Sequence, residues 1–123
     1  MGATESFPPI ETELIGGAEP SVSAEGPALV VRKGHEVGER FLIDRPRLTV
    51  GRDPGADIFL NDVTVSRQHA VLERVGASVK ISDAGSLNGT YVNGLVVDSA
   101  MLGSGDIVQI GMFQMVFVGG GPA

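Results

Sequence analysis

The sequence predicts an all-β fold, a sandwich or a barrel, on three observations. Short apolar runs rich in β-branched residues recur over residues 28–118, and glycine occupies 18 of 123 positions. No stretch of ten residues keeps a helical spacing of apolar positions without an intervening glycine. Many short strands joined by glycine-containing turns are typical of sandwiches and barrels. We therefore expect no α-helix longer than two turns.

The individual strands are predicted from alternation of apolar and polar side chains, as where Lys80 stands between Val79 and Ile81. The expected strands cover residues 28–31, 40–43, 47–50, 58–60, 70–75, 78–81, 91–92, 95–96, 107–110 and 114–118. The expected core residues are Leu29, Val31, Phe41, Leu48, Val50, Ile58, Val71, Ile81, Val92, Val108, Ile110, Val116 and Phe117.

Three turns are predicted to close hairpins between consecutive strands. They lie at residues 76–77, at Asn93-Gly94 and at Gly111. Asn93-Gly94 suits a type I′ turn, because asparagine and glycine both tolerate the positive φ that such a turn requires.

The net charge of −6 is distributed unevenly along the chain. Residues 1–27 hold five glutamates and no lysine or arginine, with several prolines and glycines, so we expect a disordered acidic tail. Residues 28–118 are expected to form one domain and residues 119–123 a flexible C-terminus. Residues 28–123 carry only −1, and the chain has no tryptophan and one tyrosine, which argues against nucleic-acid binding.

Composition also limits where the protein acts and what chemistry it performs. The absence of cysteine excludes thiolate and disulfide chemistry. No apolar run approaches the roughly 20 residues that span a bilayer, and the first residues lack the features of a secretory signal. We therefore expect a cytoplasmic protein without membrane contact.

Three polar clusters follow or precede expected strands, at residues 51–53, 65–69 and 85–90. Together they supply two arginines, several hydroxyls and an asparagine amide. Guanidinium groups make bidentate contacts to phosphate, hydroxyl and backbone N–H groups fill further acceptor positions, and glycine lets the backbone approach closely. The clusters thus indicate a phosphate-binding site.

Three other kinds of site are less consistent with the sequence. Ser66, His69 and Asp83 can be written as a nucleophile, base and orienting group, but no G-x-S-x-G motif is present. Residues 103–105 lack the third glycine and the following helix of a nucleotide-binding loop. His35 and His69 are too isolated to predict a metal site. We expect a binding module and not an enzyme, with no metal and no cofactor.

The ordered set of these motif residues resembles the signature of forkhead-associated (FHA) domains. The set comprises Gly51, Arg52, Ser66, His69, Asn88 and Gly89. The resemblance covers about residues 28–118. It implies an eleven-stranded FHA-type β-sandwich whose loops at one end bind phosphothreonine peptides.

By position, the resemblance also implies a role for each residue of the clusters. Arg52 and Ser66 would hold the phosphate, and Arg67 and Ser86 would add contacts to it. Asn88 would bond the backbone of the bound peptide.

The remaining motif residues divide into peptide contacts and architectural residues. Leu87 and Thr90 are counted among the contacts to the peptide, Thr90 with a mixed role. Gly51, His69 and Gly89 are expected to brace the loops, with His69 buried.

Residues 57–67 and 85–93 are similar to small actinobacterial regulators of this family, the oxoglutarate dehydrogenase inhibitor and glycogen accumulation regulator group. The similarity implies a monomer in which a Ser/Thr protein kinase phosphorylates tail threonines. The phosphorylated tail would then occupy the protein's own site. The unphosphorylated form would restrain 2-oxoglutarate- and glutamate-metabolising enzymes.

The candidate phosphorylation sites of this chain are Thr12 and Thr4. The similar proteins carry adjacent threonines, whereas Thr12 stands alone between Glu11 and Glu13. The alternative function is a scaffolding module that binds partners without phosphate and has no tail switch.

Overall fold

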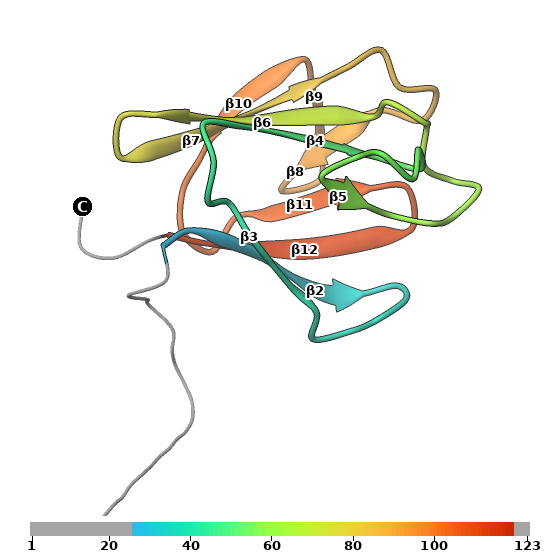
Figure 1. Ribbon diagram of the computed structural model, residues 1–123, viewed down its shortest axis with the longest axis horizontal. Helices are drawn as coiled ribbons and strands as arrows, with labels where there is room; N and C mark the ends of the chain where they lie inside the picture. The colour runs from blue at the N-terminus through green and yellow to red at the C-terminus, as the bar shows by residue number, and fades with distance from the viewer. Residues whose placement is uncertain (1–25, 120–123) are drawn as a thin grey trace, which may run out of the picture.

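The computed structural model of the chain describes residues 26–119. The expected tail, with Thr4 and Thr12, lies outside the described residues apart from its last two positions, and so do residues 120–123. Within the described part the fold is all-β and contains no helix (Figure 1). No helix there is long and apolar enough to cross a membrane.

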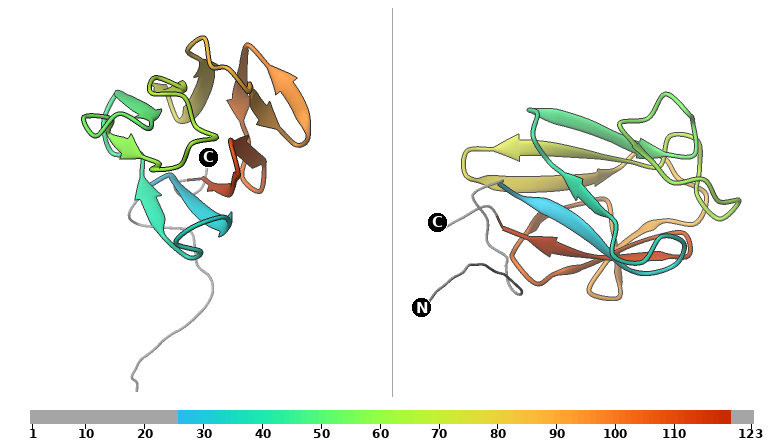
Figure 2. Two further views of the ribbon diagram at one scale, coloured as in Figure 1. Left: turned by 90° about the vertical axis from the view of Figure 1, so that its right-hand side faces the viewer. Right: turned by 60° about the horizontal axis from the view of Figure 1, so that its bottom comes forward.

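Eleven strands form two sheets that pack face to face, which confirms the expected eleven-stranded sandwich (Figure 2). The strands are β2 (Ala28–Lys33), β3 (Arg40–Leu42), β4 (Arg47–Gly51), β5 (Ile58–Phe59), β6 (Ala70–Val75), β7 (Ser78–Asp83), β8 (Thr90–Val92), β9 (Leu95–Val97), β10 (Ser99–Leu102), β11 (Ile107–Ile110) and β12 (Phe113–Val118).

The five-stranded sheet has the order β10-β7-β6-β4-β5, and the six-stranded sheet the order β3-β2-β12-β11-β8-β9. Every pairing is antiparallel except that of β4 with β5, which is parallel. The sequence did not predict strand β10, whose residues Ser99-Ala100-Met101-Leu102 include no β-branched side chain.

The three expected hairpin turns are present. Val75 pairs with Ser78 around Gly76, Val92 with Leu95, and Ile110 with Phe113. Asn93 has a φ of 51° and Gly94 one of 83°, as a type I′ turn demands.

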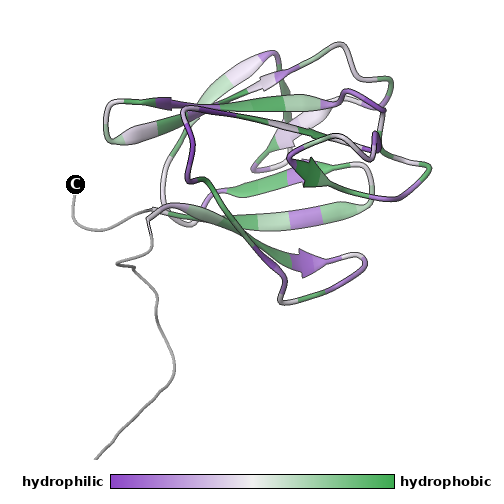
Figure 3. Ribbon diagram, viewed as in Figure 1, coloured by the Kyte–Doolittle hydropathy of each residue, from purple (hydrophilic) through white to green (hydrophobic). Residues whose placement is uncertain are grey.

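Hydrophobic side chains from both sheets form the buried core. Figure 3 shows how hydrophobic and hydrophilic residues are distributed along the strands of both sheets. Ten of the thirteen expected core residues are buried, and three are only partly buried: Phe41, Val71 and Val116. In β6 and β12 the buried positions are instead Ala70 and Leu72, and Phe113, Met115 and Phe117.

The error at Val71 has a simple geometric reason. Alternate side chains of a strand point to opposite faces, so adjacent residues cannot both face the core. In β6 each face of the strand begins with an apolar residue, Ala70 on one face and Val71 on the other, so the sequence does not show which face is buried. The register with β7, which pairs Leu72 with Ile81 and Val71 with Ser82, decides that Leu72 faces inward.

We predict that Leu72→Ala costs about 2–5 kcal/mol of the free energy of unfolding, because it opens a cavity in a fully buried site. Val71→Ala on the outer face should cost clearly less. Urea denaturation of the two variants measures the difference. Equal losses would contradict the observed register of β6.

Candidate functional site

The loops that follow β4, β5 and β7 gather at one end of the sandwich, on the right in Figure 1 and away from the β6–β7 turn. These loops carry all three polar clusters. The structure therefore brings together residues that stand up to about 40 positions apart in the sequence.

His69 joins two of these loops from inside the sandwich. Its side chain is fully buried, as expected. Nδ1 accepts a hydrogen bond from the backbone N–H of Ser66 at 3.0 Å, and Nε2 lies 2.9 Å from the carbonyl of Gly89. Because a backbone amide can only donate, Nδ1 is the acceptor and Nε2 carries the hydrogen that goes to Gly89.

Arg52 is held next to Ser66 by two hydrogen bonds to the backbone of the second loop. Its backbone N–H donates to the Ser66 carbonyl at 3.0 Å, and its Nε donates to the carbonyl of Val65 at 3.0 Å. Its two terminal nitrogens have no hydrogen-bond partner among residues 26–119. The half-buried guanidinium is thus oriented by one nitrogen and leaves donors for a ligand.

The preceding glycine allows this close approach. A Cβ on Gly51 would overlap the carbonyl oxygen of Arg67 and lie 2.8 Å from its carbonyl carbon. Any larger residue would push apart the backbone segments that carry Arg52 and Ser66.

Ser66 and Asn88 connect the second loop to the third. The Ser66 hydroxyl accepts a hydrogen bond from the backbone N–H of Leu87 at 2.9 Å. The Asn88 side-chain amide donates to the carbonyl of Thr64 at 3.0 Å. The hydroxyl hydrogen of Ser66 and the amide oxygen of Asn88 have no partner in the described chain, so both can contact a ligand.

The third loop is organised by Asp83. Its carboxylate accepts hydrogen bonds from the backbone N–H groups of Gly85 and Ser86, and from the hydroxyls of Ser86 at 2.5 Å and Thr90 at 2.8 Å. The Ser86 oxygen in turn accepts from the N–H of Gly89 at 2.9 Å. This one carboxylate holds residues 85–90 in place.

The Asp83 network gives Thr90 and Ser86 a structural role that the sequence did not predict. Thr90 is fully buried and presents no surface to a peptide. The Ser86 hydroxyl donates its hydrogen to Asp83 and the residue is only partly buried, so its contact with a phosphate stays a prediction. Both residues act on the site through Asp83, whereas Arg67 and Asn88 are exposed and the Leu87 side chain is 89% exposed.

The sequence signalled Asp83 only as a member of a possible catalytic triad, and the structure does not form that triad. Asp83 bonds Ser86 and Thr90 instead of His69, and His69 bonds the backbone of Ser66 instead of its hydroxyl. Aspartate two residues before Gly85 is typical of an Asx turn, and this signal could have identified its role.

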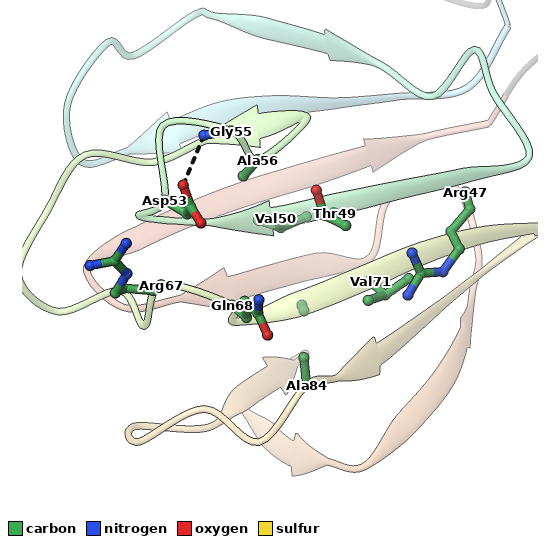
Figure 4. A pocket seen from close by; sticks show the side chains of 11 residues that line it. Arg47, Thr49, Val50, Asp53, Gly55, Ala56, Arg67, Gln68, Val71 and Ala84 are labelled. Atoms are coloured by element: carbon green, nitrogen blue, oxygen red, sulfur yellow. Dashed lines mark hydrogen bonds between the residues drawn. The ribbon is translucent and has the colours of Figure 1, made fainter.

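Arg67 stands where the site meets a groove on the outer face of the five-stranded sheet (Figure 4). The groove measures about 390 Å³, and Thr49 and Val71 line it. Arg67 and Arg47 lie at its two ends, and Asp53 on its wall accepts the N–H of Gly55 at 2.9 Å.

No group of three or more acidic, histidine or cysteine side chains that could hold a metal ion occurs within residues 26–119.

Comparison with known proteins agrees with this fold. The FHA domain family model matches residues 48–111, and the chain therefore belongs to the forkhead-associated (FHA) family. FHA domains are binding modules, so the chain is not an enzyme.

Two curated relatives are the oxoglutarate dehydrogenase inhibitor of Corynebacterium diphtheriae and the glycogen accumulation regulator GarA of Mycolicibacterium smegmatis. The first is 52% identical over 104 residues, which cover 85% of this chain and 73% of the relative. The second is 53% identical over 108 residues, which cover 86% and 66%. This chain thus spans about two thirds to three quarters of their lengths.

A solved FHA domain, studied for its phosphothreonine-dependent interactions, superposes with a TM-score of 0.72 at 26% identity. The match covers 80% of this chain and 99% of that domain.

The hydrogen bonds of the third loop shift the pKa of Asp83, and this shift makes the stability of the protein depend on pH. Burial raises this pKa, but hydrogen bonds from the hydroxyls of Ser86 and Thr90 and from the backbone N–H groups of Ser86 and Gly85 outweigh it. The pKa therefore lies below its ordinary value of 3.8. A carboxylate whose pKa falls on folding adds stability above its unfolded pKa and loses it as pH falls through the folded pKa.

We predict that Asp83→Asn lowers the free energy of unfolding at pH 7 by about 1–3 kcal/mol, because hydroxyl donors lose an ionised acceptor. The variant should also lose less stability than the wild type between pH 5 and pH 2. Thermal denaturation across this range measures both effects. Asp98→Asn, at an exposed aspartate without side-chain hydrogen bonds among the described residues, is the control. An unchanged pH dependence in Asp83→Asn would contradict the assignment.

Proposed function

We propose that this chain binds phosphothreonine-containing peptides at the loop end of the sandwich. The observation that carries the proposal is the convergence of the Arg52 guanidinium, the Ser66 hydroxyl and the Asn88 amide, each fixed by one hydrogen bond and each with unused capacity. A phosphothreonine brings about −1.5 to −2 charges and three acceptor oxygens, which such donors complement.

In this proposal Arg52 and Ser66 contact the phosphate directly and exposed Arg67 adds charge beside them. Asn88 uses its free oxygen to hold the backbone of the peptide, and Leu87 packs against a peptide side chain. Gly51, His69 and Gly89 keep the loops in position. The match to an FHA domain with phosphothreonine-dependent interactions supports the same chemistry.

The partners proposed for the whole protein follow from its relatives. One relative is named for inhibition of oxoglutarate dehydrogenase and another for regulation of glycogen accumulation. We propose that this chain likewise restrains an enzyme of 2-oxoglutarate or glutamate metabolism, in the compartment where that enzyme works, which is the cytoplasm. A Ser/Thr protein kinase would control this activity through the N-terminal tail.

We predict that the protein binds a phosphothreonine peptide and not the same peptide without phosphate. Arg52→Ala should weaken binding at least about tenfold, because charge-assisted hydrogen bonds contribute about 1.5–3 kcal/mol. Ser66→Ala and Asn88→Ala should weaken it less. Isothermal titration calorimetry with the paired peptides measures all of these.

A matched control for this experiment is Arg47→Ala. Arg47 is exposed and lies five residues before Arg52 at the other end of β4, about 16 Å away along the strand. Arg47→Ala removes one positive charge, as Arg52→Ala does, but it removes that charge far from the proposed phosphate site. If Arg52→Ala and Arg47→Ala bind alike, Arg52 does not hold the phosphate. Equal binding of both peptides would instead favour the phosphate-independent scaffold.

The tail switch is geometrically possible. Sixteen residues separate Thr12 from Ala28, where β2 begins at the end of the sandwich away from the site (Figure 1). Sixteen extended residues reach about 55 Å, whereas a domain of this size has a radius of gyration of about 13 Å. Short tethers give effective concentrations in the millimolar range, so a micromolar site would be mostly self-occupied.

We predict that phosphorylation of Thr12 shifts the amide resonances of Arg52, Ser66 and Asn88 to the same extent at every protein dilution. Thr12→Ala should abolish the shifts, with Thr4 as the second site to be tested in the same way. Mass spectrometry identifies the modified residue and NMR follows the shifts. Unshifted resonances in protein verified as phosphorylated on Thr12 would contradict the switch.

A further inference from the structure

A second pocket lies at the same end of the sandwich as the candidate phosphopeptide site, between the β2–β3 turn and β5. It has a volume of about 600 Å³. Its apolar wall is formed by three phenylalanines, Phe41, Phe59 and Phe113, together with Val31 and Leu60. The Phe59 side chain is 42% exposed and Phe41 is half-buried, so apolar surface is available to a ligand.

The polar rim of this pocket is acidic. Glu36 and Glu39 line it, and no lysine or arginine does. Both glutamates are exposed, and neither carboxylate forms a salt bridge or a hydrogen bond with residues 26–119. An apolar wall of phenylalanine rings beside two uncompensated carboxylates complements a cation on an aliphatic stem, through burial of the stem, cation–π attraction and charge.

Glu36 occupies its place on the rim at a conformational cost. Its φ is 57°, in the left-handed region that glycine adopts freely and that residues with a Cβ avoid. Gly34 and Gly38 in the same turn also have positive φ, so the turn needs this geometry at several positions. A glycine at position 36 would satisfy the backbone better, but it would remove a carboxylate from the pocket.

We propose that this pocket binds the side chain of a lysine or arginine from a partner protein. The aliphatic stem would lie against Phe41 and Phe59, with the charged group between Glu36 and Glu39. The charge of the rim disfavours the chain's own N-terminal segment as the occupant, because residues 1–27 hold five glutamates and no lysine or arginine side chain.

The pocket is connected to the phosphopeptide site by hydrogen bonds. His35 on its wall lies 3.1 Å from a carboxylate oxygen of Asp62 and packs edge-on against Phe113. The other Asp62 oxygen accepts the N–H of Thr64 at 2.9 Å and its hydroxyl at 2.5 Å. The Thr64 carbonyl accepts the Asn88 amide. A partner that places a basic residue in this pocket and a phosphothreonine near Asn88 would contact both ends of the hydrogen-bonded segment of residues 62–64. This consequence rests on the proposed function.

The test uses three short peptides that differ at one position between two leucines: Ac-Gly-Leu-Lys-Leu-Gly-NH₂ and its Gln and Glu counterparts. Each is titrated into the full-length protein and followed by NMR. The lysine peptide should shift the resonances of Glu36, Glu39, Phe59 and Phe113, with smaller shifts at Thr64. It should bind at least about fivefold more tightly than the Gln peptide, and the Glu peptide should not bind.

Variants locate the binding and separate it from the phosphopeptide site. Glu36→Gln combined with Glu39→Gln should abolish the preference for lysine, whereas Asp98→Asn on another face should keep it. Glu36→Gly should raise the melting temperature and weaken binding of the lysine peptide. Arg52→Ala should leave that binding unchanged, so failure of the proposed function would not affect this result. Equal binding of the three peptides, or shifts confined to residues outside the pocket, would overturn the proposal.

Discussion

The buried imidazole of His69 is the interaction on which the site depends most. It comes just before β6 of the five-stranded sheet, whereas the carbonyl it meets belongs to Gly89, just before β8 in the six-stranded sheet. Its other nitrogen holds the backbone of Ser66. One side chain thus joins the two sheets and fixes the segments that carry Ser66 and Asn88. A buried polar group must be paired on both sides to be tolerated, and this requirement makes the geometry specific.

The three loops around His69 are built on the same local device. In each, an aspartate carboxylate accepts the backbone N–H two residues later: Asp53 from Gly55, Asp62 from Thr64 and Asp83 from Gly85. Asx turns of this kind hold a loop without regular secondary structure. The loops are therefore held by their own hydrogen bonds without a ligand, and a preorganised site spends less of its binding energy on ordering itself. The negative charges of these aspartates face their own backbones, which leaves Arg52 and Arg67 to set the charge offered to a ligand.

The two ends of the 61–64 segment face different surroundings. Asn61 lines the aromatic pocket with its acidic rim, and Thr64 meets Asn88 at the phosphopeptide site. Thr64 is also packed against the β11–β12 turn: its hydroxyl accepts the N–H of Met112, and a Cβ on Gly111 would lie 2.8 Å from its carbonyl oxygen. The segment has little room to move by itself. The segment therefore connects the proposed cation-binding pocket to the candidate phosphopeptide site, and a partner that presents both charges would contact both of its ends.

The sequence by itself determined the elements that depend on neighbouring residues. β-Branched runs located ten strands, and Asn93-Gly94 selected its turn, because strand and turn preferences are local. The ordered motif residues also identified the family, and they predicted the arginine, serine and asparagine of the candidate site. Only the tertiary structure decided which face of β6 is buried, since Val71 and Leu72 fit either register until β7 pairs with the strand. It alone revealed the role of Asp83, the burial of Thr90 and the pocket of Phe41, Phe59 and Phe113, because these features arise where distant segments meet and no local pattern encodes such a meeting.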